Sequence, residues 1–153
     1  MSALRVISRY YDGCSAGDVE GMLSTLHPDV VHYFLAPNVG SAPVAGAEHL
    51  ARYWRKVTGM IAATWIIDAI VESGNDAVIE WTMMWTPPET GEQVATRGSE
   101  WFTFTDGRIS EIRSYYQQRN ESTELDGFPY TQRGYSTLAT PASAIHIPAG
   151  AAQ

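Results

Sequence analysis

The hydrophobic and polar residues follow two different periods along the chain, and the change falls near residue 62. Before it, apolar residues recur at the three- and four-residue spacing that is typical of amphipathic helices. This spacing predicts three helices, the first ending near residue 15, the second over about 19–27 and the third over about 47–58. A strand at residues 30–35 and a loop at residues 36–46 are expected between the second helix and the third.

After residue 62, apolar and polar residues alternate, which is the period of strands that bury one face. The alternation predicts strands at 64–71 and 77–86, followed by a β-hairpin over residues 97–118 around Asp106-Gly107. Helices followed by strands are typical of the α+β class. We therefore expect a cone-shaped, curved antiparallel sheet packed against three N-terminal helices, with an open mouth that forms a natural pocket.

The length of 153 residues suits one domain. From Asn120 onward prolines and small residues become frequent, which favours an extended segment over a second core. We predict one domain at residues 1–119 and a C-terminal extension at residues 120–153, an arm or partly ordered tail.

The charge balance narrows the class of partner. There are 17 acidic residues against 10 Lys and Arg, a net charge of -7, which argues against nucleic acid or a membrane as a partner. No apolar run is long enough to span a bilayer, and the N-terminus lacks the pattern of a signal peptide. We therefore expect a cytoplasmic protein that handles small molecules or other proteins.

Glu100 is the residue whose environment depends most on the register of the hairpin. It is in phase with Phe102, so the face that buries the ring also buries the carboxyl group. A two-residue turn at Asp106-Gly107 would place Glu100 opposite Arg113, as a cross-strand ion pair. A three-residue loop ending at the same glycine would place it opposite Ile112. One residue of slip thus separates a surface pair from an isolated acid in an apolar wall.

Four short motifs stand out along the chain: YYDGCSAGDVEG at residues 10–21, PDVV at 28–31, VGSAP at 39–43 and FTFTDGRI at 102–109. They resemble the NTF2-like superfamily, and most closely its SnoaL-like proteins and ketosteroid isomerases. The resemblance spans residues 4–118. It implies the cone fold and a pocket for a small hydrophobic molecule, in a superfamily that includes isomerases, dehydratases, polyketide cyclases, epoxide hydrolases and inert adaptors.

The resemblance also implies roles for single residues. Tyr10 stands where the isomerases have the tyrosine that donates a hydrogen bond to the substrate oxyanion, and Glu100 stands where they have a second, protonated donor. Trp54 replaces a tyrosine that is hydrogen-bonded to the first one. Phe34 occupies the position of the aspartate base, and a benzyl group cannot move protons. The resemblance therefore does not predict steroid isomerisation by that route, although it favours the three-residue turn.

His32 is the candidate replacement for the missing base. It precedes Phe34 by two residues on the same strand face, and the ordinary pKa of histidine, about 6.5, suits proton transfer at neutral pH. An apolar wall around Glu100 would raise the pKa of its carboxyl group and favour the neutral donor form. The alternatives are a core histidine without a catalytic role, and a Glu100 paired with Arg97, Arg113 or Ser114.

These residues predict a cofactor-independent enzyme that uses acid/base chemistry on a small hydrophobic carbonyl, enol or epoxide compound, as an isomerase, lyase or cyclase. The alternative is a non-catalytic binding or interaction module. We expect a homodimer formed through Trp101, Ile109 and Tyr115 on the other face of the hairpin. No histidine or cysteine spacing indicates a metal site. The predicted substrate-binding residues are Phe34, Trp54, Trp81, Phe102, Ser114 and Tyr116.

Overall fold

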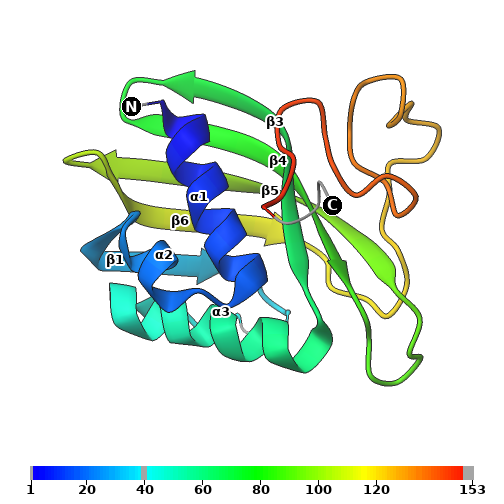
Figure 1. Ribbon diagram of the computed structural model, residues 1–153, viewed down its shortest axis with the longest axis horizontal. Coiled ribbons are helices and arrows are strands. Elements are labelled where there is room, and N and C mark those ends of the chain that lie inside the picture. Colours follow the sequence, from blue (N-terminus) through cyan, green and yellow to red (C-terminus); the bar gives the residue numbers. More distant parts are fainter. Residues whose placement is uncertain (1, 39–40, 150–153) are drawn as a thin grey trace.

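A single curved sheet with helices on one side forms the body of the molecule, as the computed structural model shows (Figure 1). The structure describes residues 2–38 and 41–149, so Val39 and Gly40 of the predicted loop and residues 150–153 of the predicted extension lie outside it. Within the described part, six strands pair in the order β2-β1-β6-β5-β4-β3. The strands are β1 (Leu26–Phe34), β2 (Val44–Ala45), β3 (Thr64–Ser73), β4 (Asp76–Trp85), β5 (Val94–Thr105) and β6 (Arg108–Tyr116).

Three helices come from the N-terminal part, as predicted: α1 (Ala3–Ala16), α2 (Val19–Leu23) and α3 (Ala47–Ile61). Helix α1 lies across the concave face of the sheet, and α3 runs along the β1 side (Figure 1). Ser2 caps the start of α1, and Gly17 ends it with φ 68°, a conformation that glycine adopts without strain. None of the helices in the described residues is long and apolar enough to cross a membrane.

The α+β cone is confirmed, but two details of the prediction are wrong. The sheet is mixed, because β1 pairs with β6 in parallel. These two strands are far apart in the sequence, so no hairpin turn forces them to run in opposite directions. In addition, α2 ends at Leu23, and β1 already begins at Leu26, which we had expected in the helix. Pro28 fits inside β1 because the pairing with β6 is interrupted between Leu26 and Val31.

The hairpin takes neither of the two predicted registers. Asp106 and Gly107 form a two-residue turn with φ 54° and 75°, as in a type I′ turn, and Thr105 pairs with Arg108. The register then shifts by one residue at a bulge, because Phe104 pairs with Ile109 while Thr103 pairs with Glu111. As a result Glu100 lies opposite Ser114.

The bulge also changes the outer face of the hairpin. Ile109 is fully buried, so the prediction that it lies on that face is wrong. Trp101 and Tyr115 are exposed by 42% and 49%. A homodimer through this face therefore stays a prediction that rests on fewer apolar residues.

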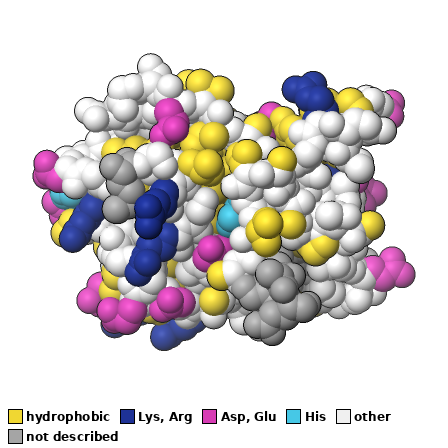
Figure 2. Space-filling model, turned by 45° about the horizontal axis from the view of Figure 1, so that its top comes forward, with side chains coloured by type: hydrophobic (Ala, Val, Ile, Leu, Met, Phe, Trp, Pro, Cys, Tyr) yellow, Lys and Arg dark blue, Asp and Glu magenta, His cyan; other side chains and the backbone are white. Residues whose placement is uncertain are grey.

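The C-terminal extension folds back on the sheet. It covers the ends of β3, β4 and β5 (Figure 1). On the face of the molecule that Figure 2 shows, hydrophobic side chains gather near the middle. Thr123 forms a bridge with Thr96. At the edge strand β3, the Ile67 N–H donates to Nδ1 of His146, and the Ser143 hydroxyl donates to the Ile67 carbonyl oxygen. The extension thus satisfies backbone groups that an unpaired edge strand would expose.

Arg97 and Asp68 form a buried ion pair under the extension. The guanidinium Nη1 lies 3.6 Å from Asp68 Oδ2 and donates to the Ser136 carbonyl oxygen at 2.7 Å, and the group stacks on Tyr130 at 3.8 Å. Asp68 Oδ1 accepts from the Ser136 N–H at 2.8 Å. Burial raises the pKa of Asp68, and hydrogen bonds from Thr82 and Ser136 together with the charge of Arg97 oppose that rise.

We predict that Arg97→Met lowers the free energy of unfolding by about 3 kcal/mol, because it leaves a buried carboxylate without its cation. The matched control is Arg52→Met, which removes an exposed pair with Glu48 and costs less than about 0.5 kcal/mol. Urea unfolding followed by tryptophan fluorescence measures both. Equal losses would contradict a structural role for the buried pair.

Candidate functional site

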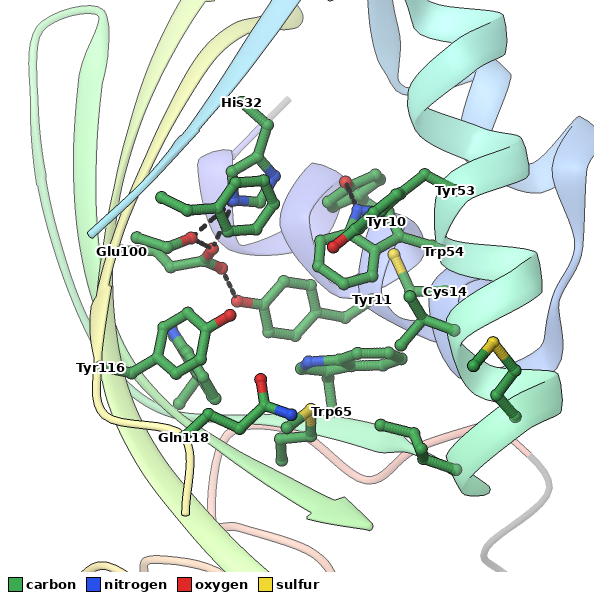
Figure 3. A pocket seen from close by; sticks show the side chains of 17 residues that line it. Tyr10, Tyr11, Cys14, His32, Tyr53, Trp54, Trp65, Glu100, Tyr116 and Gln118 are labelled. Atoms are coloured by element: carbon green, nitrogen blue, oxygen red, sulfur yellow. Dashed lines mark hydrogen bonds and ion pairs between the residues drawn. The ribbon is translucent and has the colours of Figure 1, made fainter. Parts of the chain in front are cut away.

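A cavity of about 130 Å³ lies between the concave face of the sheet, α1 and α3 (Figure 3). Phe102 is the one predicted site residue that does not line it, because Phe102 is fully buried in the core beside Tyr11. All the other predicted site residues meet at this cavity. They are Tyr10, His32, Phe34, Trp54, Trp81, Glu100, Ser114 and Tyr116.

A hydrogen-bonded group centred on Glu100 occupies one wall of the cavity (Figure 3). The Tyr11 hydroxyl donates to Glu100 Oε1, and the Ser114 hydroxyl donates to Oε2. Nε2 of His32 lies 2.6 Å from Ser114 Oγ and 3.3 Å from Glu100 Oε2. Glu100 is 5% exposed. It is therefore buried as expected, but it is not the isolated acid that the three-residue turn predicts.

The partners of Ser114 indicate a direction for this hydrogen-bond chain. Because its hydroxyl donates to Glu100, its oxygen is left to accept from His32, and this arrangement predicts a hydrogen on Nε2 of His32. Nδ1 of His32 is buried and has no hydrogen-bond partner among the described residues. The Phe34 ring stacks on the imidazole at 4.1 Å between centroids and 6° between planes. Phe34, which stands at the position of the family's base, thus holds the imidazole of His32 in its orientation.

Three strands and one helix bring this group together. Pairing of β5 with β6 places Glu100 opposite Ser114, and the parallel pairing of β1 with β6 places Phe34 beside Ser114. Since side chains two residues apart share a face, His32 lies on the same concave face. Tyr11 reaches Glu100 from α1, which packs on that face.

The tyrosine that contacts Glu100 is Tyr11, the neighbour of the predicted Tyr10. The Tyr10 hydroxyl instead accepts a hydrogen bond from Trp54 Nε1 at 2.7 Å, so the contact that the resemblance implies between these two positions is present. Sequence reasoning missed Tyr11, because neighbouring residues on a helix point about 100° apart and spacing alone did not separate the two phenols. Both tyrosines have helical spacing with Ile7 and Cys14 and both are buried, so periodicity does not indicate which of them reaches Glu100.

The cavity also contains polar groups that sequence reasoning did not single out. These are the side chains of Tyr53 and Gln118, which line it. Figure 3 shows the Gln118 amide pointing toward the interior of the cavity, as does the hydroxyl of Tyr116, which was predicted. Gln118 follows the end of β6, where no periodic pattern identifies a buried face. Among the described residues, no three His, Cys, Asp or Glu side chains converge as metal ligands.

The phenols of the cavity are held in their neutral form. Burial and the charge of Glu100 raise the pKa of Tyr11 well above its ordinary value of 10.0. Burial is also the largest cause of the raised pKa of Tyr10, Tyr53 and Tyr116. Burial likewise raises the pKa of the Cys14 thiol. These tyrosines can therefore donate hydrogen bonds at neutral pH but cannot serve there as anionic bases.

We predict that these buried tyrosines, among the eight of the chain, stay un-ionised at pH values where a free tyrosine ionises, near 10.0. Because their pKa is higher in the folded state, the stability that the neutral phenols contribute is present below about pH 10 and is lost as the pH rises further. An alkaline titration of absorbance at 295 nm, run alongside circular dichroism, should show their ionisation together with unfolding. Ionisation of all eight near pH 10 with the fold intact would contradict this.

The SnoaL-like domain family matches the chain over residues 7–112. No curated protein matches it. Among solved structures, a protein of unknown function with a cystatin-like fold from Methylobium petroleophilum PM1 is 32% identical, with a TM-score of 0.65, over 87% of this chain and 90% of that one.

Two more distant structures share the fold. An NTF2-like protein of unknown function from Burkholderia pseudomallei K96243 is 20% identical with a TM-score of 0.65, over 76% of this chain and 92% of that one. A protein from Jannaschia sp. CCS1 that is called a SnoaL-like polyketide cyclase is 17% identical with a TM-score of 0.62, over 76% and 90%. Because the family model matches residues 7–112, most of the folded domain, the chain belongs to the SnoaL-like domain family.

Proposed function

We propose that this protein is a cofactor-independent enzyme that acts by acid/base chemistry on a small hydrophobic carbonyl, enol or epoxide compound, as an isomerase, lyase or cyclase. The observation that carries the proposal is the buried group of His32, Ser114, Glu100 and Tyr11 at the wall of an aromatic cavity. Buried titratable groups that converge in a cavity are typical of catalytic sites.

Glu100 is the proton acceptor in this proposal. Its carboxylate removes a proton from the carbon next to the substrate carbonyl, so that the C–H bond breaks and the electron pair moves onto the carbonyl oxygen. Ser114 and His32 hold the carboxylate in place through Oε2. The proton on Glu100 then returns to a different carbon in an isomerase, or the enolate expels a leaving group or closes a ring in a lyase or cyclase.

Tyr11 stabilises the charge that develops on the substrate oxygen. In the resting site its hydroxyl donates to Glu100. Once Glu100 has taken up a proton, that donor is free to turn to the enolate oxygen, and the raised pKa keeps it protonated until then. The Tyr116 hydroxyl, which also points into the cavity, is a second donor (Figure 3). The relative called a polyketide cyclase supports the reaction class by analogy of fold alone.

The alternative is a binding module without catalysis. It is favoured by Phe34, which stands at the position of the family's base and stacks on His32. It is also favoured by the donors that already satisfy Glu100 within the protein. In that case the same cavity binds a ligand and releases it without chemical change.

The enzyme and the binding module differ in one measurable event, the exchange of carbon-bound hydrogen in the ligand. We predict that the protein catalyses deuterium incorporation from D₂O next to the carbonyl of cyclic ketones, measured by proton NMR. Glu100→Gln should slow this exchange by about 100-fold or more, because general acid/base catalysis typically contributes that factor. Tyr11→Phe should slow it too, because the oxyanion loses a donor.

The matched control is Glu111→Gln, which removes a half-exposed carboxylate on β6 and should leave the rate unchanged. A cyclic ketone that binds in the cavity without exchanging would support the binding module. Equal rates for the wild type and Glu100→Gln would exclude Glu100 as the proton acceptor.

A further inference from the structure

We infer that the ligand of this cavity is a compound with a single six-membered ring that carries a carbonyl or hydroxyl oxygen, such as a cyclic enone, enol or phenol. The inference narrows the substrate class of the proposed function, and in that respect it rests on that function. It depends on the size of the cavity, the rigidity of its walls and the position of its polar groups.

The volume sets the first limit. The cavity measures about 130 Å³. A protein cavity of roughly 150 Å³ accommodates benzene, so the space within these walls matches one ring. Eight of its 17 lining residues are Phe, Tyr or Trp, which favours a flat ring through edge and face contacts.

The walls cannot easily move apart. The Trp54 indole is fixed by its hydrogen bond to Tyr10 and packs edge-on against Trp65 and Tyr53, with centroids 5.2 and 4.8 Å away. On the opposite wall Trp81 lies on Gly98, where an added Cβ would come within 2.4 Å of the indole. Gly98 therefore lets Trp81 pack directly against the backbone of β5. Because both indoles are packed on their far sides, a larger ligand has to displace core side chains.

The polar groups set the chemistry of the ring. Glu100 and Tyr11 meet the cavity at one wall, and Tyr116 and Gln118 point into it (Figure 3). Tyr11 and Glu100 are already hydrogen-bonded to each other, so the Tyr116 hydroxyl and the Gln118 amide are the groups that gain a partner from a hydroxyl or carbonyl oxygen on the ring. A purely hydrocarbon ring offers them none. The cavity therefore selects an oxygenated ring over benzene or toluene.

The test is a series of ligands that differ only in ring number: phenol, 2-naphthol and 2-anthrol, with toluene as the ring without oxygen. Affinities are measured by proton NMR line broadening and by quenching of tryptophan fluorescence. We expect phenol to bind, and 2-naphthol and 2-anthrol to bind about tenfold or more weakly because they overfill the site. Toluene should bind more weakly than phenol. If burial of apolar surface alone determined the affinity, 2-naphthol and 2-anthrol would bind more tightly than phenol.

A pair of variants locates the effect at the wall. Met83→Ala removes a side chain that lines the cavity and should restore binding of 2-naphthol. Met84→Ala makes the same change on the opposite face of β4, in a separate cluster with Ile66 and Ala95, and should not restore it. If Met83→Ala fails to fold, the wild-type series still decides. Binding of 2-anthrol by the wild type as tight as that of phenol would overturn the inference.

The outcome is separable from that of the proposed function. If only single-ring compounds bind and the protein catalyses no deuterium exchange, the single-ring ligand is supported and the proposed enzymatic function is excluded. Exchange on fused-ring ketones at the rate of one-ring ketones supports the enzyme and overturns the single-ring class.

Discussion

The burial of the Glu100 carboxylate is the constraint on which the rest of the site depends. A carboxylate removed from water is stable only if donors in the protein replace the lost hydration. Tyr11 from α1 and Ser114 from β6 supply those donors, and His32 from β1 supports the serine. Because these groups come from three separate elements, the acid ties α1 to the concave face at the place where the cavity lies. An apolar side chain at residue 100 would need none of these contacts.

The bulge in β6 makes this arrangement possible. It lets the hairpin keep a favourable two-residue turn and still places Glu100 opposite a small hydroxyl side chain. Without the bulge the acid would face Arg113, which points to the outer face and stacks over Trp101. A local irregularity of one residue therefore decides whether the acid belongs to the surface or to the cavity.

The fold could be predicted because it follows from periodicity, which is a local property of the sequence. The bulge, the choice of Tyr11 over Tyr10 and the burial of His146 could not, because each depends on contacts between residues far apart in the chain. The extension is the clearest case. Its composition is that of a loose arm, yet single polar contacts such as the one between Ser136 and Asp68 hold it to the sheet. Such contacts leave no repeating pattern in the sequence.

In the site described above, Ser114 and His32 form a directed chain of donors that ends at Glu100. The most direct measurement is the tautomer of His32, read from long-range proton–nitrogen NMR correlations of its ring. We expect the Nε2–H form, with a proton that exchanges slowly with water because it is hydrogen-bonded to Ser114. A hydrogen on Nδ1 with Nε2 unprotonated would reverse the direction of the chain and exclude this arrangement of the site.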